Sequence, residues 1–215
     1  MRLFQFSYSP FAAKVRKCLE LKGLAFEAVE VPYLDRRELV ALTGGYVHVP
    51  VLEDGGAVIT DSAPITAWLD ERYPPSLRGG PHGPLAEVVE QWADQVLEDV
   101  AFRLAVPPLD ARYAALQGGR EDARALFRLV KERKFGAGCI EAWDRDAAGL
   151  SSQLAALLAP LVRQVGRSPF LLGDAASLAD AAVWGQLFFV EQSRPGWIAR
   201  EVPGLSAWYE RVAAT

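Results

Sequence analysis

The sequence predicts an α/β domain followed by an all-α domain. Up to about residue 73, short apolar segments alternate with helical patterns, and residues 74–84 are then rich in proline and glycine. From Leu85 onward, apolar residues recur at helical spacing and no pair of strands is evident. The chain has 215 residues, 51% of them apolar, and can bury a substantial core. We therefore expect one domain over residues 1–78 and a second, all-helical domain over residues 85–215.

Strands and helices alternate in the first half. Apolar segments predict strands at residues 3–6, 26–31, 49–52 and 57–60, and helices are expected at residues 9–23, 35–45 and 62–73. Ser9-Pro10 begins the first helix, since proline suits the first helical position, and Asp35 to Glu38 forms a capping box for the second. Asp54-Gly-Gly56 is a hairpin turn signal. This order of elements is that of a thioredoxin-like domain, in which a parallel pair and a hairpin share one sheet.

Apolar residues at helical spacing predict the helices of the second half. They form three groups: Val88, Val89, Trp92, Val96 and Leu97; Leu126, Leu129 and Val130; and Leu154, Leu157, Leu158 and Leu161. Ser177-Leu-Ala-Asp180 is a further capping box, with aspartate in place of glutamate. It opens a nearly all-apolar helix over residues 181–190, which we expect at the centre of this domain.

Composition narrows the classes of function. The chain has 27 acidic and 23 basic residues and no concentrated basic block, which argues against nucleic acid or an anionic membrane as a partner. The apolar run at the N-terminus ends at Ser7, so it does not read as a signal peptide, and we expect a cytoplasmic protein. Cys18 and Cys139 lie far apart and the chain has 2 histidines, so neither a disulfide framework nor a metal site is predicted.

Two motifs eleven residues apart suggest a binding site for an extended ligand. Pro50 lies in an apolar segment, and the Val49–Pro50 bond is a place where a cis peptide is tolerated. A cis bond there would present the backbone of Val49 to a ligand that pairs with it as an added strand. Asp61-Ser62 precedes a helix start, where a hydroxyl and free N–H groups favour a carboxylate.

These motifs resemble the cytosolic glutathione transferase family. The resemblance covers the whole chain and is most specific in the first half, through Ser9-Pro-Phe-Ala-Ala-Lys-Val-Arg16, Leu21-Lys-Gly23, Val49-Pro-Val-Leu52 and Asp61-Ser62. In the second half it depends on Phe170-Leu-Leu-Gly-Asp174 and Ser177 to Asp180. The family implies a thioredoxin-like domain followed by a helical one, glutathione as cosubstrate, detoxification chemistry on a small hydrophobic electrophile, and a homodimer.

Ser9 is the candidate catalytic residue. In the thioredoxin fold a Cys-Pro-x-Cys motif stands at the start of the first helix, because a helix N-terminus favours a thiolate. Here the four positions are Ser9-Pro10-Phe11-Ala12, so the protein has no thiol of its own there and keeps a hydroxyl that can donate to the sulfur of glutathione. Ser7 and Tyr8 compete for this contact, since other branches of the family use a tyrosine near this strand end.

The resemblance also assigns the remaining contacts. Ser62 is expected to bind the γ-glutamyl carboxylate and Asp61 its amino group, with Val49, next to Pro50, pairing with the cysteinyl unit. Arg36 and His48 are expected to face the glycyl carboxylate. The electrophile pocket is expected between the domains, lined by Tyr8, Phe11, Phe102, Arg103 and Tyr113, with Trp92 nearby.

Other functions remain open from the sequence. A glutathione-dependent peroxidase, isomerase or dehalogenase would need the same bound thiolate. Reductases of the family generally have cysteine at the position of Ser9, which disfavours deglutathionylation. A binding or scaffolding protein with this fold often loses the glutathione contacts, whereas Val49-Pro50 and Asp61-Ser62 are present here.

Overall fold

The computed structural model describes residues 1–78 and 82–215. The elements of the first part are β1 (Arg2–Gln5), α1 (Pro10–Leu21), β2 (Glu27–Glu30), α2 (Arg37–Thr43), β3 (Val51–Asp54), β4 (Ala57–Thr60) and α3 (Ser62–Arg72). The second part holds α4 (Gly83–Trp92), a π-helical turn (Ala93–Leu97), α5 (Glu98–Leu116), α6 (Glu121–Phe135), α7 (Cys139–Arg145), α8 (Ala147–Val165), α9 (Leu178–Ser193), α10 (Trp197–Glu201), a short 3₁₀ turn (Pro203–Leu205) and α11 (Ser206–Ala214).

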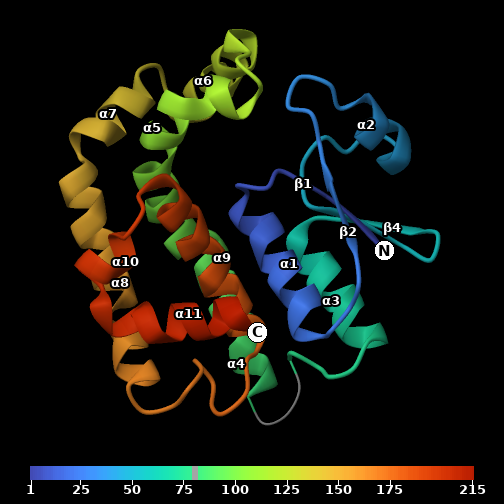
Figure 1. The fold of residues 1–215 in the computed structure, drawn as a ribbon, viewed down its shortest axis with the longest axis vertical. Helices are drawn as coiled ribbons and strands as arrows, with labels where there is room; N and C mark the ends of the chain where they lie inside the picture. The colour runs from blue at the N-terminus through green and yellow to red at the C-terminus, as the bar shows by residue number, and fades with distance from the viewer. Residues whose placement is uncertain (79–81) are drawn as a thin grey trace.

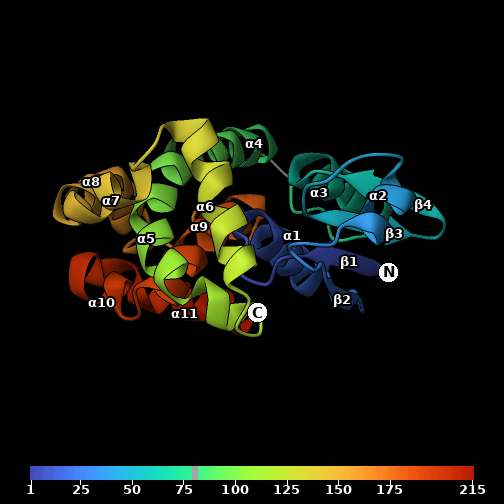
Figure 2. The same cartoon turned by 90° about the horizontal axis from the view of Figure 1, so that it is seen from above.

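The strands form one mixed sheet in the order β2-β1-β3-β4 (Figure 2). β1 pairs in parallel with β2 and antiparallel with β3, and β3 pairs antiparallel with β4. This confirms the predicted combination of a parallel pair and a hairpin. Side chains alternate across a strand: Leu3 and Leu52 pack against α1 and α3, whereas Phe4 and Val51 belong to the core on the opposite face.

Two local predictions in this half are corrected. β3 begins at Val51 and not at Val49, because Pro50 has no N–H to give to a ladder. The capping box at Asp35 is wrong: Arg36 is the N-cap of α2 and makes no side-chain capping bond. The Asp35 carboxylate instead accepts a hydrogen bond from the backbone N–H of Arg37 at 3.1 Å, which closes a local turn.

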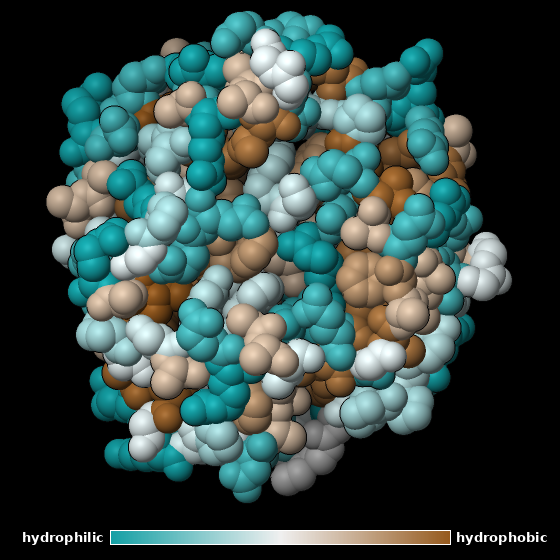
Figure 3. Space-filling view, in the orientation of Figure 1, coloured by the Kyte–Doolittle hydropathy of each residue, from teal (hydrophilic) through white to brown (hydrophobic). Residues whose placement is uncertain are grey.

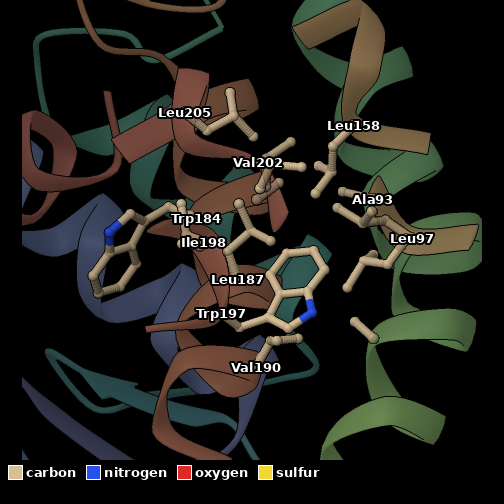
Figure 4. Close-up of a cluster of buried hydrophobic side chains, with 14 of the residues drawn as sticks. Ala93, Leu97, Leu158, Trp184, Leu187, Val190, Trp197, Ile198, Val202 and Leu205 are labelled. Atoms are coloured by element: carbon tan, nitrogen blue, oxygen red, sulfur yellow. The ribbon is translucent and has the colours of Figure 1, made fainter. Parts of the chain in front are cut away.

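In the helical half, α9 lies at the centre, as predicted (Figure 4). Its side chains pack on several sides, because nearly all of its residues are apolar and buried. The predicted capping box is present: the Asp180 carboxylate accepts from the Ser177 N–H at 3.0 Å. The same carboxylate accepts from the Leu171 N–H at 2.9 Å and the Trp208 indole at 2.8 Å, and so fixes the start of α9 to two other segments.

The predicted apolar face of residues 88–97 is partly wrong. Val88 and Val96 are 61% and 44% exposed. Leu97 is buried in the core, and Val89 and Trp92 are partly buried against it, as predicted, together with Ala93. α4 continues through the π-helical turn into α5, and such a turn shifts the helical phase, so spacing alone does not identify the buried side.

The two halves join where α1 crosses α9 (Figure 1). Gly185 allows the close crossing, because a Cβ there would lie 2.6 Å from the Pro10 carbonyl oxygen and 3.0 Å from the Lys14 nitrogen. The segment rich in proline and glycine, residues 74–84, separates the two halves, as expected of a linker; residues 79–81 lie outside the described residues, and α4 begins at Gly83. No helix in the described part of the chain has the length and hydropathy that a membrane crossing requires.

Candidate functional site

A cleft of about 390 Å³ lies between the two halves. Figure 3 shows hydrophobic residues where the halves meet, among hydrophilic ones. On the side of the sheet the cleft is lined by Phe6, Tyr8, Ser9, Pro10, Phe11, Tyr33, Arg36, Val47, His48 and Val49. The opposite wall is made by residues of α5, α6 and α9: Glu98, Phe102, Val106, Leu109, Phe127, Val130, Lys131 and Phe189. The cleft is therefore mainly apolar, with a few polar groups at its edges.

Ser9 lies in this cleft at the N-terminus of α1. It is the N-cap, with Pro10 as the first helical residue, and its hydroxyl oxygen accepts from the Ala12 N–H at 3.3 Å. This arrangement agrees with the predicted start of the helix. Because the oxygen acts as acceptor within the cap, the hydroxyl proton remains available to donate.

Ser7 and Tyr8 are engaged elsewhere. The Ser7 hydroxyl donates to the Glu30 carboxylate at 3.3 Å, and Ser7 does not line the cleft. Tyr8 does line it, but its hydroxyl lies 2.8 Å from that of Tyr113 on α5. Burial raises the pKa of both tyrosines, so both phenols stay neutral at physiological pH.

The backbone around Val49 has the predicted form. The Val49–Pro50 bond is cis. Among the described residues, no hydrogen bond occupies the N–H or C=O of Val49, which lines the cleft. His48 is exposed at the cleft edge, with its ring 5.5 Å from that of Tyr46.

Arg36 reaches the cleft from the start of α2. Its guanidinium donates to the Val47 carbonyl at 2.7 Å and lies 5.0 Å from the centre of the Tyr33 ring. Its Nε–H also donates to the Tyr33 carbonyl at 3.4 Å, so Arg36 is fixed beside His48 and Val49. Its Nη2 group makes no hydrogen bond to the described residues and can donate to an anion.

Asp61 and Ser62 do not line the cleft but adjoin it through Pro50. The Asp61 N–H donates to the Pro50 carbonyl at 3.2 Å. Asp61 has φ 71° and ψ 145°, the one positive φ of a residue other than glycine in the described chain. Ser62 is the first residue of α3 and is 2% exposed, and its hydroxyl makes no hydrogen bond to the described residues. A hydroxyl without a partner beside the first N–H groups of a helix suits an anionic ligand.

Next to this region is a buried group of charges that sequence reasoning missed. The Lys14 ammonium contacts the Glu90 carboxylate at 3.0 Å and that of Asp94 at 2.5 Å. Arg78 reaches the other oxygen of Glu90 at 3.2 Å. Burial raises the pKa of Asp94, although Lys14 opposes that shift. No sequence signal pairs residues so far apart in the chain, so only the fold reveals this group.

Of the residues predicted to line the electrophile pocket, the structure brings Tyr8, Phe11 and Phe102 into the cleft. Tyr113 is fully buried behind Tyr8. Arg103 points elsewhere and donates to Asp99 at 2.7 Å.

Trp92, expected near that pocket, packs instead against the core around α9. Cys18 is buried in the core with its thiol pKa raised to about 12 by burial, which agrees with an unreactive packing role. In the described chain no three histidine, cysteine, aspartate or glutamate side chains gather as a metal site would require.

Two charged residues of the helical wall were also missed. Burial raises the pKa of Glu98 on α5, whereas burial and then the charge of Arg36 lower the pKa of Lys131 on α6 to about 7. No role was predicted for Lys131 from the sequence. Its spacing of four residues from Phe127, which places both on one helix face, was the available signal.

Comparison with family models supports the fold. Residues 3–80 match the model of the glutathione S-transferase N-terminal domain, and residues 137–211 match that of the glutathione S-transferase C-terminal domain. Among curated proteins, glutathione S-transferase 4 of Zea mays is 23% identical, over 100% of this chain and 88% of its own length. A probable glutathione S-transferase of Oryza sativa subsp. japonica is 28% identical, over 96% of this chain and 81% of its own.

Solved structures agree. A glutathione S-transferase from Rhodospirillum rubrum F11 superposes with a TM-score of 0.72 at 27% identity, and the match covers 100% of this chain and 88% of that one. A glutathione S-transferase of Ceriporiopsis subvermispora, solved in complex with glutathione, gives a TM-score of 0.81 at 19% identity, over 99% and 95% of the two chains. The second likeness shows the fold alone.

Proposed function

Since the chain belongs to the glutathione transferase family, we propose that it joins the sulfur of glutathione to a small hydrophobic electrophile. The observation that carries this proposal is the Ser9 hydroxyl at the N-terminus of α1, which faces an apolar cleft between the two halves. Glutathione bound on the sheet-side wall and an apolar electrophile bound on the helical wall would meet in this cleft.

Ser9 would act by stabilising the thiolate. A free cysteine thiol has a pKa of about 8.5, so it is mostly protonated at neutral pH. A hydrogen bond from the Ser9 hydroxyl and the positive end of the helix dipole both favour the charged sulfur, and together supply roughly 1–3 kcal/mol. Ser9 keeps its proton throughout. The thiol proton leaves to solvent, and the sulfur then attacks the electrophilic carbon and displaces its leaving group, which departs with the bonding electron pair.

The rest of glutathione would extend along the sheet-side wall. The free backbone groups of Val49 suit the cysteinyl unit, and the Ser62 hydroxyl with the first N–H groups of α3 suits the γ-glutamyl carboxylate. Asp61 would contact the γ-glutamyl amino group. Arg36 and His48, at the other end of the cleft, would receive the glycyl carboxylate.

The helical wall would bind the electrophile. Phe102 contacts Phe135 and Phe189 with ring centroids 5.7 and 6.2 Å apart, and Phe102 and Phe189 present apolar surface to the cleft. Tyr8 and Phe11 complete that surface from the other side. Burial of an apolar compound here contributes about 25 cal/mol per Å² of apolar surface removed from water.

The proposal includes a cytoplasmic homodimer and the two domains over residues 1–78 and 85–215. The exposed apolar side chains of Leu85, Val88 and Val96 on α4 and the adjoining π-helical turn support self-association, because water contact with such a row is unfavourable. Sedimentation velocity tests it: a dimer that Val88→Glu converts to a monomer is expected, and a monomeric wild type would contradict it.

The site itself is tested by calorimetric titration of reduced glutathione into the wild type, Ser9→Ala, Ser62→Ala and Ser7→Ala. We expect Ser62→Ala to weaken binding by about tenfold, since one hydrogen bond to a charged group is lost. Ser9→Ala should bind but lose the ultraviolet absorbance of the bound thiolate at neutral pH, while Ser7→Ala should match the wild type.

Three outcomes decide between the functions. Saturable binding and thiolate formation that depend on Ser9, followed by conjugation of a model electrophile, would support transfer. Reduction of a peroxide or isomerisation without conjugation would select the other thiolate chemistries. Absence of binding at millimolar glutathione would refute both and leave a scaffold with this fold.

A further inference from the structure

Lys131 is an amine set into the apolar wall of the cleft. It lies in α6, where it lines the cleft with Phe127 and Val130. Its Nζ is 3.3 Å from the centre of the Phe127 ring and 5.9 Å from that of Tyr33. These aromatic faces attract a cation but are weak substitutes for water or a carboxylate.

No carboxylate of the described residues pairs with this amine. The salt bridges of α6 involve its other basic residues: Arg124 and Arg128 hold Asp110 at 3.1 and 2.7 Å. Asp110 still acts on Lys131 from α5, but its charge is shared with those two arginines. Lys131 therefore has no protein anion of its own.

The other groups around Lys131 mostly disfavour its charge. Arg36 acts on it from the start of α2 and Lys134 from its own helix, and both repel a cation. Cys139 on α7 acts the other way and raises the pKa of Lys131, as Asp110 does, and the Tyr33 ring lies on the sheet side. Burial and, after it, the charge of Arg36 lower the pKa of Lys131 to about 7.

We propose that Lys131 selects electrophiles that carry a carboxylate, which it binds as an ion pair at the apolar wall of the cleft. This rests on the proposed glutathione transfer. Two observations favour the electrophile over the glycyl end of glutathione as the anion. Lys131 belongs to the wall of Phe102 and Phe127, whereas Arg36 and His48 stand on the wall of Val49. Glu98 lies on the same wall as Lys131 and disfavours a ligand carboxylate close to it. On this wall the carboxylate of the electrophile is therefore expected beside Lys131.

The pair also predicts a pH dependence. A ligand carboxylate stabilises the charged amine and raises its pKa above 7, so binding above neutral pH takes up a proton. Uptake on binding means that affinity for an acidic ligand falls as pH rises from 7 to 9. A neutral ligand of the same shape shows no such uptake at Lys131.

The test compares two product analogues, S-benzylglutathione and S-(para-carboxybenzyl)glutathione, by calorimetry at pH 8 in buffers of different ionisation enthalpy. The wild type should bind the carboxylate about tenfold more tightly, with uptake of close to one proton. Lys131→Met, which keeps the length without the charge, should abolish that preference and the uptake. Arg133→Met, which removes an exposed basic side chain from the same helix, is the matched control and should retain both.

The outcomes separate this inference from the transferase proposal. If neither analogue binds the wild type, the glutathione site itself is refuted. If S-benzylglutathione binds but the carboxylate gives no preference, or the preference survives in Lys131→Met, the inference is wrong while transfer stands. If Lys131→Met weakens unsubstituted S-methylglutathione as much as the carboxylate analogue, the amine serves the glycyl arm and the inference is likewise overturned.

Discussion

At Asp61 the backbone adopts φ 71° and ψ 145°, a conformation that costs a residue with a side chain about 1–3 kcal/mol. The Asp61 N–H is held by the Pro50 carbonyl, and the next residue opens α3. The turn therefore connects the two parts of the proposed glutathione site. A positive φ at a residue other than glycine persists where the surrounding structure requires that conformation. At Asp61 it also keeps a carboxylate at a position that glycine would otherwise suit better.

Asp61→Gly and Asp61→Ala separate the strain from the carboxylate. Glycine adopts positive φ readily, so Asp61→Gly should unfold with about 1 kcal/mol more free energy than Asp61→Ala, which keeps the strain. Both should bind glutathione about tenfold more weakly if the carboxylate meets the γ-glutamyl amino group. Urea unfolding and calorimetry measure the two quantities, and equal stability of the variants would contradict the strain.

At the scale of elements, α9 determines where the catalytic helix lies. It is buried along most of its length, its start is fixed by Asp180, and it packs against α1 (Figures 1 and 4). Gly185 is the point of closest approach, with Pro10 and Lys14 opposite it. Because Pro10 follows Ser9, any displacement of α1 by α9 also moves the proposed thiolate donor.

Gly185→Ala should therefore affect stability and activity together. Its Cβ would lie 2.6 Å from the Pro10 carbonyl oxygen, so the two helices must move apart at a cost of about 1–3 kcal/mol. We expect a lower unfolding free energy and a lower kcat for conjugation. Gly166→Ala, whose Cβ meets its nearest atoms at an ordinary 3.5 Å, is the control and should keep the wild-type values. A fully stable and active Gly185→Ala would disprove the close crossing.

At the scale of the whole molecule, the buried charges join the two halves. Lys14 comes from α1, Glu90 from α4 and Asp94 from the π-helical turn, and the Lys14 side chain is 1% exposed. A buried charge that loses its partner is costly, whereas an exposed pair contributes little. The group therefore acts as an electrostatic requirement for the halves to dock in one position.

Lys14→Met should lower the unfolding free energy by about 3 kcal/mol at pH 7, because Asp94 loses its cation and Glu90 keeps only Arg78. The loss should shrink as pH falls, since burial raises the pKa of Asp94 and protonation removes its unpaired charge. Thermal unfolding at pH 5 and 7 measures this. Arg37→Met, which removes a pair whose arginine is 90% exposed, should change stability by less than about 0.5 kcal/mol. A similar loss of unfolding free energy in Lys14→Met and Arg37→Met would contradict the difference between buried and exposed charges.

Local patterns predicted the fold well, because they report local physics. Ser9-Pro10, the turn at Gly55-Gly56 and the capping box at Asp180 each act within a few residues, and each is present in the structure. Asp35 shows where local patterns fail. A capping box requires its carboxylate to accept from the backbone N–H of Glu38, but the carboxylate accepts from the nearer N–H of Arg37.

Contacts across the chain were not predictable in this way. Phe102 faces the cleft and Arg103 does not, because one residue turns the side chain by about 100° and the phase of α5 is set by its packing. The Tyr8–Tyr113 hydrogen bond and the place of Lys131 in the cleft likewise depend on how the halves dock. The same holds for the exposure of Val88.

The late position of α9 in the chain has a consequence during translation. The ribosome releases the sheet and α1 long before it reaches Leu178, and until then the surface of α1 around Pro10 and Lys14 has no helix to cover it. A nascent chain that stalls before this point displays uncovered apolar and charged groups, which chaperones and proteases recognise. Chaperones and proteases therefore have access to this face of α1 before α9 covers it.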